Sequence, residues 1–118
     1  MMKLLDTDLK VLDILWAQGD TSAKQISDIL SAQIGWNINT TYTVIKRCIA
    51  KGAIARIDPG FICHALVARE QAQLEETNAL MDRLYGGSAE LLVAALVNNR
   101  KLSSAEIDRL SKLIDSYK

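Results

Sequence analysis

The sequence predicts a mainly α-helical fold with one small β-hairpin, arranged as a winged helix-turn-helix domain followed by a C-terminal helical dimerisation domain. Three observations predict this class. Two amphipathic helical segments meet at Gly35, two short apolar segments flank the turn Asp58-Pro59-Gly60, and the pattern beyond that hairpin is helical. We therefore expect one domain over residues 1–67 and a three-helix domain over residues 68–118.

The first two helices are predicted over residues 6–18 and from Ser22 to about residue 34. Asp6 or Thr7 can cap the first helix, whose positive N-terminal end suits acidic side chains, and a glycine ends it. Ser22 and Gln25 match a capping box, in which each side chain satisfies the backbone N–H of the other residue. Gly35 then makes the turn into the third helix.

The third helix has Asn37 as its expected N-cap and Gly52 as its expected stop. Its apolar stripe has the spacing of a half-buried helix and consists of Thr41, Val44, Ile45, Cys48 and Ile49. Its polar side consists of Asn39, Tyr42, Thr43, Lys46 and Ala50, with Arg47 at the edge. A polar helix that follows a helix and a short turn is typical of a DNA-reading helix.

A short β-hairpin is predicted directly after this helix, over residues 53–57 and 61–66. In the turn between them, Pro59 has a fixed φ and Gly60 accepts a positive φ. A hairpin in this place is a wing, and we expect its tip near a phosphate backbone or a minor-groove edge.

The chain is formally neutral, but its charges are unevenly distributed. No acidic residue lies between Asp28 and Asp58, an interval that contains the cations Lys46, Arg47, Lys51 and Arg56. A neutral chain can therefore present one locally positive face, which contact with phosphates requires.

Catalysis, metal binding and membrane insertion find no support in the sequence. His64 is the only histidine, too few ligands for a zinc site, and no nucleophile set or phosphate-binding glycine loop is present. We expect no cofactor and no enzyme activity. The apolar run over residues 91–97 is too short to span a bilayer, and acidic residues interrupt any signal-peptide pattern. We expect a soluble cytoplasmic protein.

The two cysteines, Cys48 and Cys63, both lie in apolar patterns. We interpret them as reduced core residues, which suits a cytoplasmic protein. A disulfide or a metal-binding pair is the alternative.

Three helices are predicted in the C-terminal domain, over residues 68–84, over residues 89–98 and from Ser103 onward, where Ser103 and Glu106 form a second capping box. The middle helix is apolar nearly all round, so it must be covered on every side. Because 118 residues bury a modest core, we expect a second subunit to cover it. The predicted dimerisation residues are Leu74, Met81, Leu84, Leu92, Leu96, Ile107, Leu110 and Ile114.

The ordered set of motifs resembles the BlaI/MecI/CopY family of penicillinase-type transcriptional repressors over essentially the whole chain. The segments that carry the resemblance include residues 11–16 (VLDILW), 21–30, Gly35-Trp36, 40–52, 65–67, 81–88 (MDRLYGGS) and 101–106. The resemblance implies a winged-helix domain, a helical domain that dimerises, and repression through a dyad-symmetric operator.

Members of this family respond to different signals. In β-lactam-responsive members a membrane sensor leads to cleavage of the repressor, so the resemblance implies a sensor or antirepressor protease as a further partner. The place where cleaved members have Asn-Phe holds Ala95-Leu96 here. Copper-responsive members carry Cys-x-Cys pairs, which this sequence lacks. The wing is also short and lacks the usual basic residues after its turn.

The predicted partner is double-stranded operator DNA, and the predicted contact residues are Ser22, Lys24, Asn39, Thr40, Tyr42, Thr43, Lys46, Arg47 and Lys51. Amides and hydroxyls on the third helix read base edges, and its cations neutralise phosphates. Ser22 and Lys24 contact the backbone from the start of the second helix. Two alternatives remain at single residues: Tyr42 covers Trp36, and Lys51 is a cation favoured by the helix dipole. The alternative function is a winged-helix protein–protein module that has lost DNA binding.

Overall fold

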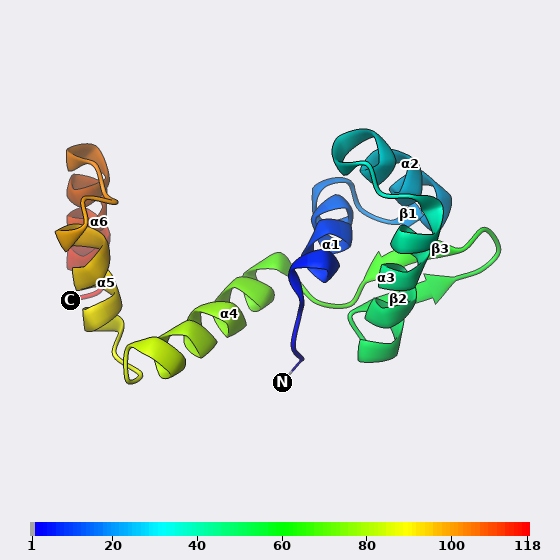
Figure 1. Cartoon of the computed structure of the whole chain (residues 1–118). Helices are drawn as coiled ribbons and strands as arrows, with labels where there is room; N and C mark the ends of the chain where they lie inside the picture. Colours follow the sequence, from blue (N-terminus) through cyan, green and yellow to red (C-terminus); the bar gives the residue numbers. More distant parts are fainter. Residues whose placement is uncertain (1) are drawn as a thin grey trace. The chain divides into compact units, whose positions relative to one another are not determined.

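The computed structural model describes residues 2–118 and divides the chain into two compact units, up to Leu74 and from Glu75 onward. The division falls inside a helix, whereas the sequence places the domain boundary after Val67. The elements in order are α1 (Asp6–Gln18), β1 (Thr21–Ser22), α2 (Ala23–Ile34), α3 (Ile38–Lys51), β2 (Ile54–Ile57), β3 (Ile62–Ala65), α4 (Arg69–Leu84), α5 (Ala89–Asn98) and α6 (Ser104–Ser116) (Figure 1).

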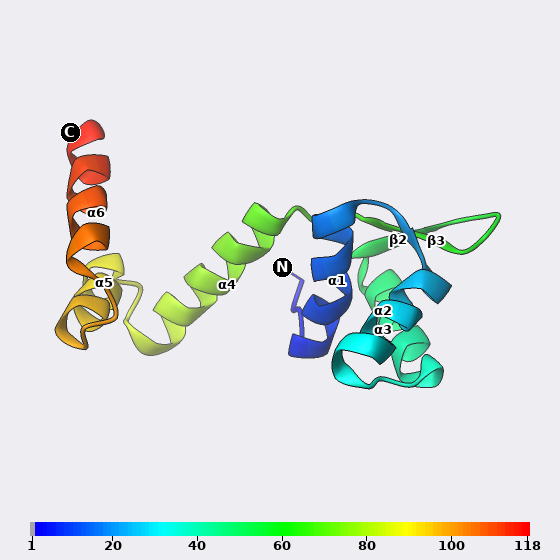
Figure 2. The same ribbon diagram turned by 90° about the horizontal axis from the view of Figure 1, so that it is seen from above.

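The first unit is a three-helix cluster with a small antiparallel sheet, in which the strand order is β1-β3-β2. Figure 2 shows the turn between β2 and β3 projecting away from the helices as a wing. The largest side chains of the core come from all three helices and from β2, and they include Leu12, Ile26, Leu30, Ile45 and Ile54. The predicted class, mainly α-helical with a small β-wing, is confirmed.

The predicted helix limits and most of the predicted caps are confirmed. Ser22 and Gln25 form the capping box of α2, and Asn37 caps α3 by accepting a hydrogen bond from the backbone of Thr40 at 2.8 Å. Gly35 and Gly52 end these helices in left-handed conformations, with φ of 73° and 82°, which glycine adopts without a steric penalty.

In the first unit one predicted cap is wrong, and one strand was not predicted. The N-cap of α1 is Leu5 rather than Asp6 or Thr7, because the carboxylate of Asp8 accepts the Leu5 backbone N–H at 2.8 Å. The sheet has a third strand, because Thr21 pairs with Cys63 immediately before α2 begins. A two-residue strand is too short for its period to show in a sequence.

An aromatic side chain beside the turn of the wing packs onto α3. The rings of Tyr42 and Phe61 meet edge to face, with centroids 5.7 Å apart at 80°. The guanidinium of Arg56 lies over the ring of Phe61, 3.8 Å from its centre, and also forms an ion pair with Asp58 at 3.1 Å. Tyr42 thus contacts the wing, which the sequence did not predict.

Both cysteines are buried and unpaired, as the reduced-core interpretation predicts. Burial raises the pKa of the Cys48 thiol to about 12 and that of Cys63 to about 11. Both thiols are therefore uncharged near neutral pH, and they behave as small apolar core groups.

The second unit contains the end of α4 together with α5 and α6, and none of its residues is fully buried. Ser88 caps α5, and Ser103 and Glu106 form the capping box predicted for α6. Large apolar side chains are exposed along both helices, and they include Leu91, Val97, Leu113, Ile114 and Tyr117. Within the described chain, no helix combines the length and the apolar character needed to cross a bilayer.

Replacing Ile45 by alanine is expected to lower the free energy of unfolding by about 2–5 kcal/mol, because it leaves a cavity in a close-packed core. Ile45 is 0% exposed, whereas Ile38, on the same helix, is 56% exposed. The matched variant Ile38→Ala should change stability by less than about 0.5 kcal/mol. Urea unfolding measures both, and equal losses would contradict the placement of α3 in the core.

Candidate nucleic-acid interface

One face of α3 is packed into the core, and the opposite face is open. Thr41, Val44, Ile45 and Cys48 are buried. The open face carries Asn39, Thr40, Thr43 and Lys46, all exposed, with Tyr42 half-buried beside them. Amides, hydroxyls and an ammonium on one exposed helix face supply the donors and acceptors that base edges and phosphates need.

A shallow depression of about 410 Å³ runs along the first half of this face. All of its lining residues but Val44 are polar or charged residue types, and the set consists of Thr7, Asn37, Asn39, Thr40, Thr43, Val44 and Arg47. Thr7 belongs to α1, so the start of the first helix forms one wall of the surface that α3 presents. The sequence pattern did not predict a place for Thr7 in this site.

The two cations at the edge and end of α3 are held by a buried carboxylate. Asp8, 0% exposed, accepts hydrogen bonds from Arg47 through Nε at 3.0 Å and Nη2 at 2.6 Å. The ammonium of Lys51 donates to the other carboxylate oxygen at 2.5 Å and to the backbone carbonyl of Lys3 at 2.9 Å. Arg47 also donates to the hydroxyl of Thr7. These bonds join α1 to α3.

Asp8 is ionised despite its burial. Burial alone would raise the pKa of this carboxyl, but the hydrogen bonds from Lys51, from the Leu5 amide and from Arg47 outweigh it. The net effect is a pKa below the ordinary value of 3.8. The negative charge is therefore present at neutral pH and opposes the two cations that it binds.

Asp8 is the residue of this site that sequence analysis missed. An acid-free interval between Asp28 and Asp58 predicted a locally positive face, but Asp8 binds two of its cations from another helix. A signal was present: Asp8 precedes Val11 and Leu12 by three and four residues, which places it on the buried face of α1. A charged residue on such a face requires a partner.

The other predicted contact residues lie at the start of α2. The hydroxyl of Ser22 accepts the backbone N–H of Gln25 at 3.1 Å, so it serves as a cap. Lys24 is largely exposed and forms a 3.7 Å ion pair with Asp28 one turn later. An exposed pair of this kind is weak, so the ammonium of Lys24 is free to exchange partners.

The wing has little free positive charge. No Lys or Arg lies between Arg56 and Arg69, and Arg56 is engaged with Asp58 and the ring of Phe61. The contact between the rings of Phe61 and Tyr42 holds this part of the wing against α3.

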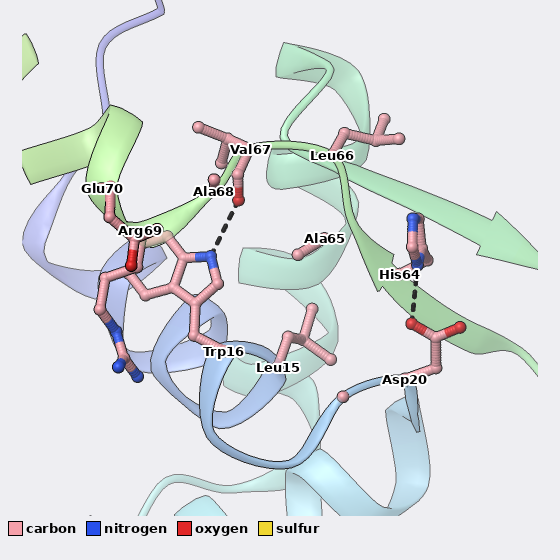
Figure 3. A pocket seen from close by; sticks show the side chains of 11 residues that line it. Leu15, Trp16, Asp20, His64, Ala65, Leu66, Val67, Ala68, Arg69 and Glu70 are labelled. Atoms are coloured by element: carbon pink, nitrogen blue, oxygen red, sulfur yellow. Dashed lines mark hydrogen bonds and ion pairs between the residues drawn. The ribbon is translucent and has the colours of Figure 1, made fainter.

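A second hollow, of about 550 Å³, lies where the chain leaves β3, between the end of α1 and the start of α4 (Figure 3). The indole Nε1–H of Trp16 donates to the carbonyl of Val67 at 2.8 Å, and Nδ1 of His64 lies 2.7 Å from the carboxylate of Asp20. Over residues 2–118, no three His, Cys, Asp or Glu side chains gather closely enough to hold a metal ion. The hydrogen bonds anchor the connection that follows the sheet.

A family model described as "Penicillinase repressor" matches residues 5–116. The chain belongs to the penicillinase repressor family. It is 23% identical to the penicillinase repressor of Bacillus licheniformis, over 98% of this chain and 92% of that one. It is 25% identical to the methicillin resistance regulatory protein MecI of Mammaliicoccus sciuri, over 96% of this chain and 94% of the relative.

The fold of this chain is also similar to that of a solved structure. The solution structure of the DNA-binding domain of the repressor BlaI is similar to this chain, with a TM-score of 0.54 and 24% identity. The match covers 60% of this chain and 93% of the other. The winged-helix prediction and the family resemblance are therefore confirmed. The protein belongs to a family of repressors, and this membership confirms that it is not an enzyme.

The lowered pKa of Asp8 predicts a specific loss of stability in acid. A carboxyl group whose pKa is lower in the folded state stabilises the fold above its unfolded-state pKa, and this contribution disappears as pH falls through the folded-state value. Below about pH 4, unfolding free energy should fall more steeply in the wild type than in Asp8→Asn, by up to about 1.4 kcal/mol per pH unit. Urea unfolding between pH 7 and pH 2 measures this, and parallel curves would contradict it.

Proposed function

We propose that this repressor acts in the cytoplasm as a homodimer that recognises a dyad-symmetric operator through α3. The observation that carries the proposal is the exposed polar face of α3, set on a winged-helix unit with its opposite face locked in the core. Residues 1–67 serve as the DNA-binding domain and residues 68–118 as the dimerisation domain.

Within this proposal, base reading falls to Asn39, Thr40 and Thr43, whose side chains are exposed near the start of α3. An asparagine amide pairs best with adenine, and hydroxyls accept or donate to several base edges. Lys46 lies further along the same face and neutralises phosphate. Tyr42 contributes its phenolic edge while its ring rests on the wing.

Phosphate contacts come from three further places. Ser22 and Lys24 lie at the start of α2, where the positive end of the helix dipole favours an anion. Arg47 and Lys51 contribute less than their formal charges suggest, because Asp8 holds both.

The homodimer is supported by the apolar surface of the second unit. The predicted dimerisation residues are exposed or half-buried in the single chain: Leu74, Met81, Leu84, Leu92, Leu96, Ile107, Leu110 and Ile114. Large apolar side chains exposed in such number are typical of an interaction site. A dimer also places two copies of α3 on one duplex, about 34 Å or a multiple apart.

The alternative of a protein–protein module without DNA binding is set aside, because the family is one of repressors. A sensor or antirepressor protease that releases this repressor stays a prediction of the resemblance. The corresponding segment, Ala95-Leu96, lies within α5.

Substitutions on the open face of α3 should weaken operator binding. Thr43→Val removes a base-reading hydroxyl and should lower affinity about 5- to 150-fold, equivalent to about 1–3 kcal/mol. Lys46→Ala should lower affinity on all sequences and reduce the salt slope by about 0.9 per protomer. Gel shifts on the operator upstream of the gene measure both.

A charge-matched control for this experiment is Lys112→Ala, an exposed residue of α6, which should bind like the wild type. Wild-type binding by both Thr43→Val and Lys46→Ala would show that α3 does not read the operator.

Substitution of an exposed apolar residue of α6 should abolish the dimer without unfolding the chain. Ile114 is 55% exposed in the single chain, so Ile114→Lys loses little within it but places a charge in the proposed interface. Sedimentation equilibrium at micromolar concentration should give a dimer for the wild type and a monomer for the variant. Asp108→Lys, on the polar side of α6, is the control. A monomeric wild type would contradict the proposed dimer.

A further inference from the structure

We propose that Asp8 limits the positive charge that α3 presents to DNA, and so restrains binding to duplexes of any sequence. Asp8 touches no operator group in this proposal. It acts through Arg47 and Lys51, so it is a positioning residue. The inference rests on the proposed function of α3.

Arg47 and Lys51 are both hydrogen-bonded to the carboxylate of Asp8, and do not simply lie near it. Arg47 approaches one oxygen of the carboxylate through two nitrogens, and Lys51 approaches the other oxygen. Each cation has a second anchor on the N-terminal part of the chain, the Thr7 hydroxyl for Arg47 and the Lys3 carbonyl for Lys51. Their side chains are only 35% and 24% exposed. Contact with a phosphate must compete with all of these bonds.

The charge of the helix surface changes accordingly. Formally α3 carries three cations and no acid, namely Lys46, Arg47 and Lys51. Asp8 cancels one of these charges from within the unit, and it is buried, so solvent screens the pair weakly. Lys46, exposed on the open face, keeps its full charge for DNA.

This arrangement favours specificity over affinity. Phosphate contacts strengthen binding to every sequence, whereas base contacts distinguish the operator from other DNA. A helix whose end cations are held internally relies more on Asn39 and Thr43 to select its site. The same carboxylate also fixes α3 against α1, so the orientation of the reading face and its charge are set by one group.

The test is the salt dependence of binding to a duplex of unrelated sequence by the full chain. Asp8→Asn keeps the size of the side chain and removes its charge. We expect the plot of log affinity against log salt to steepen by roughly 0.9 per protomer, with tighter binding at low salt. Thermal unfolding sets a measurement temperature at which both proteins are folded. A merely structural role for Asp8 would weaken binding without steepening this slope.

Asp13→Asn is the matched control, because it removes an equal charge from an exposed position on α1. Its slope should equal that of the wild type. A slope for Asp8→Asn that is unchanged or shallower than that of the wild type would overturn the inference.

A second pair of variants keeps the test decisive even if Asp8→Asn does not fold. Lys46→Gln should flatten the slope by roughly 0.9 per protomer, whereas Lys51→Gln should flatten it by less than half as much. Equal flattening by the two variants overturns the inference and leaves the proposed function standing. An unchanged slope in Lys46→Gln overturns the proposed function, and this inference with it.

Discussion

The buried ion pairs of Asp8 with Arg47 and Lys51 connect α1 to α3. A carboxylate removed from water is costly unless strong donors surround it. Here two cationic side chains and the Leu5 amide supply those donors, and the pKa of Asp8 falls below its ordinary range as a result. Because these bonds join α1 to α3, the angle at which α3 presents its open face depends on them.

The wing of this repressor supports α3 mainly by packing. Its single cation, Arg56, lies over Phe61 and pairs with Asp58, while Phe61 supports the ring of Tyr42. Little charge remains at the wing tip for phosphates. In the proposed function, the open face of α3 therefore bears a larger share of both anchoring and base reading than it would beside a basic wing, with Lys46 as its most available cation.

The second unit carries the features on which the proposed association of two chains rests. Its helices are well capped, so they are locally stable, but the unit buries none of its side chains fully. Capping bonds contribute about 1 kcal/mol each, which does not replace a core. The apolar stripes of α5 and α6 supply the surface from which a shared core between two chains can be built.

The sequence by itself determined the elements of this protein. Ser22, Asn37, Ser103 and the glycines at helix ends act within one turn of the chain, so their patterns predicted every helix and both hairpin strands. Contacts between distant residues depend on tertiary structure alone. Pairing of Thr21 with Cys63, stacking of Tyr42 on Phe61 and capture of two cations by Asp8 each join residues at least 19 positions apart. Sequence patterns record which face a residue occupies, but only packing decides which other face it meets. Here packing placed a buried acid against two cations of the face that the sequence predicts to be locally positive.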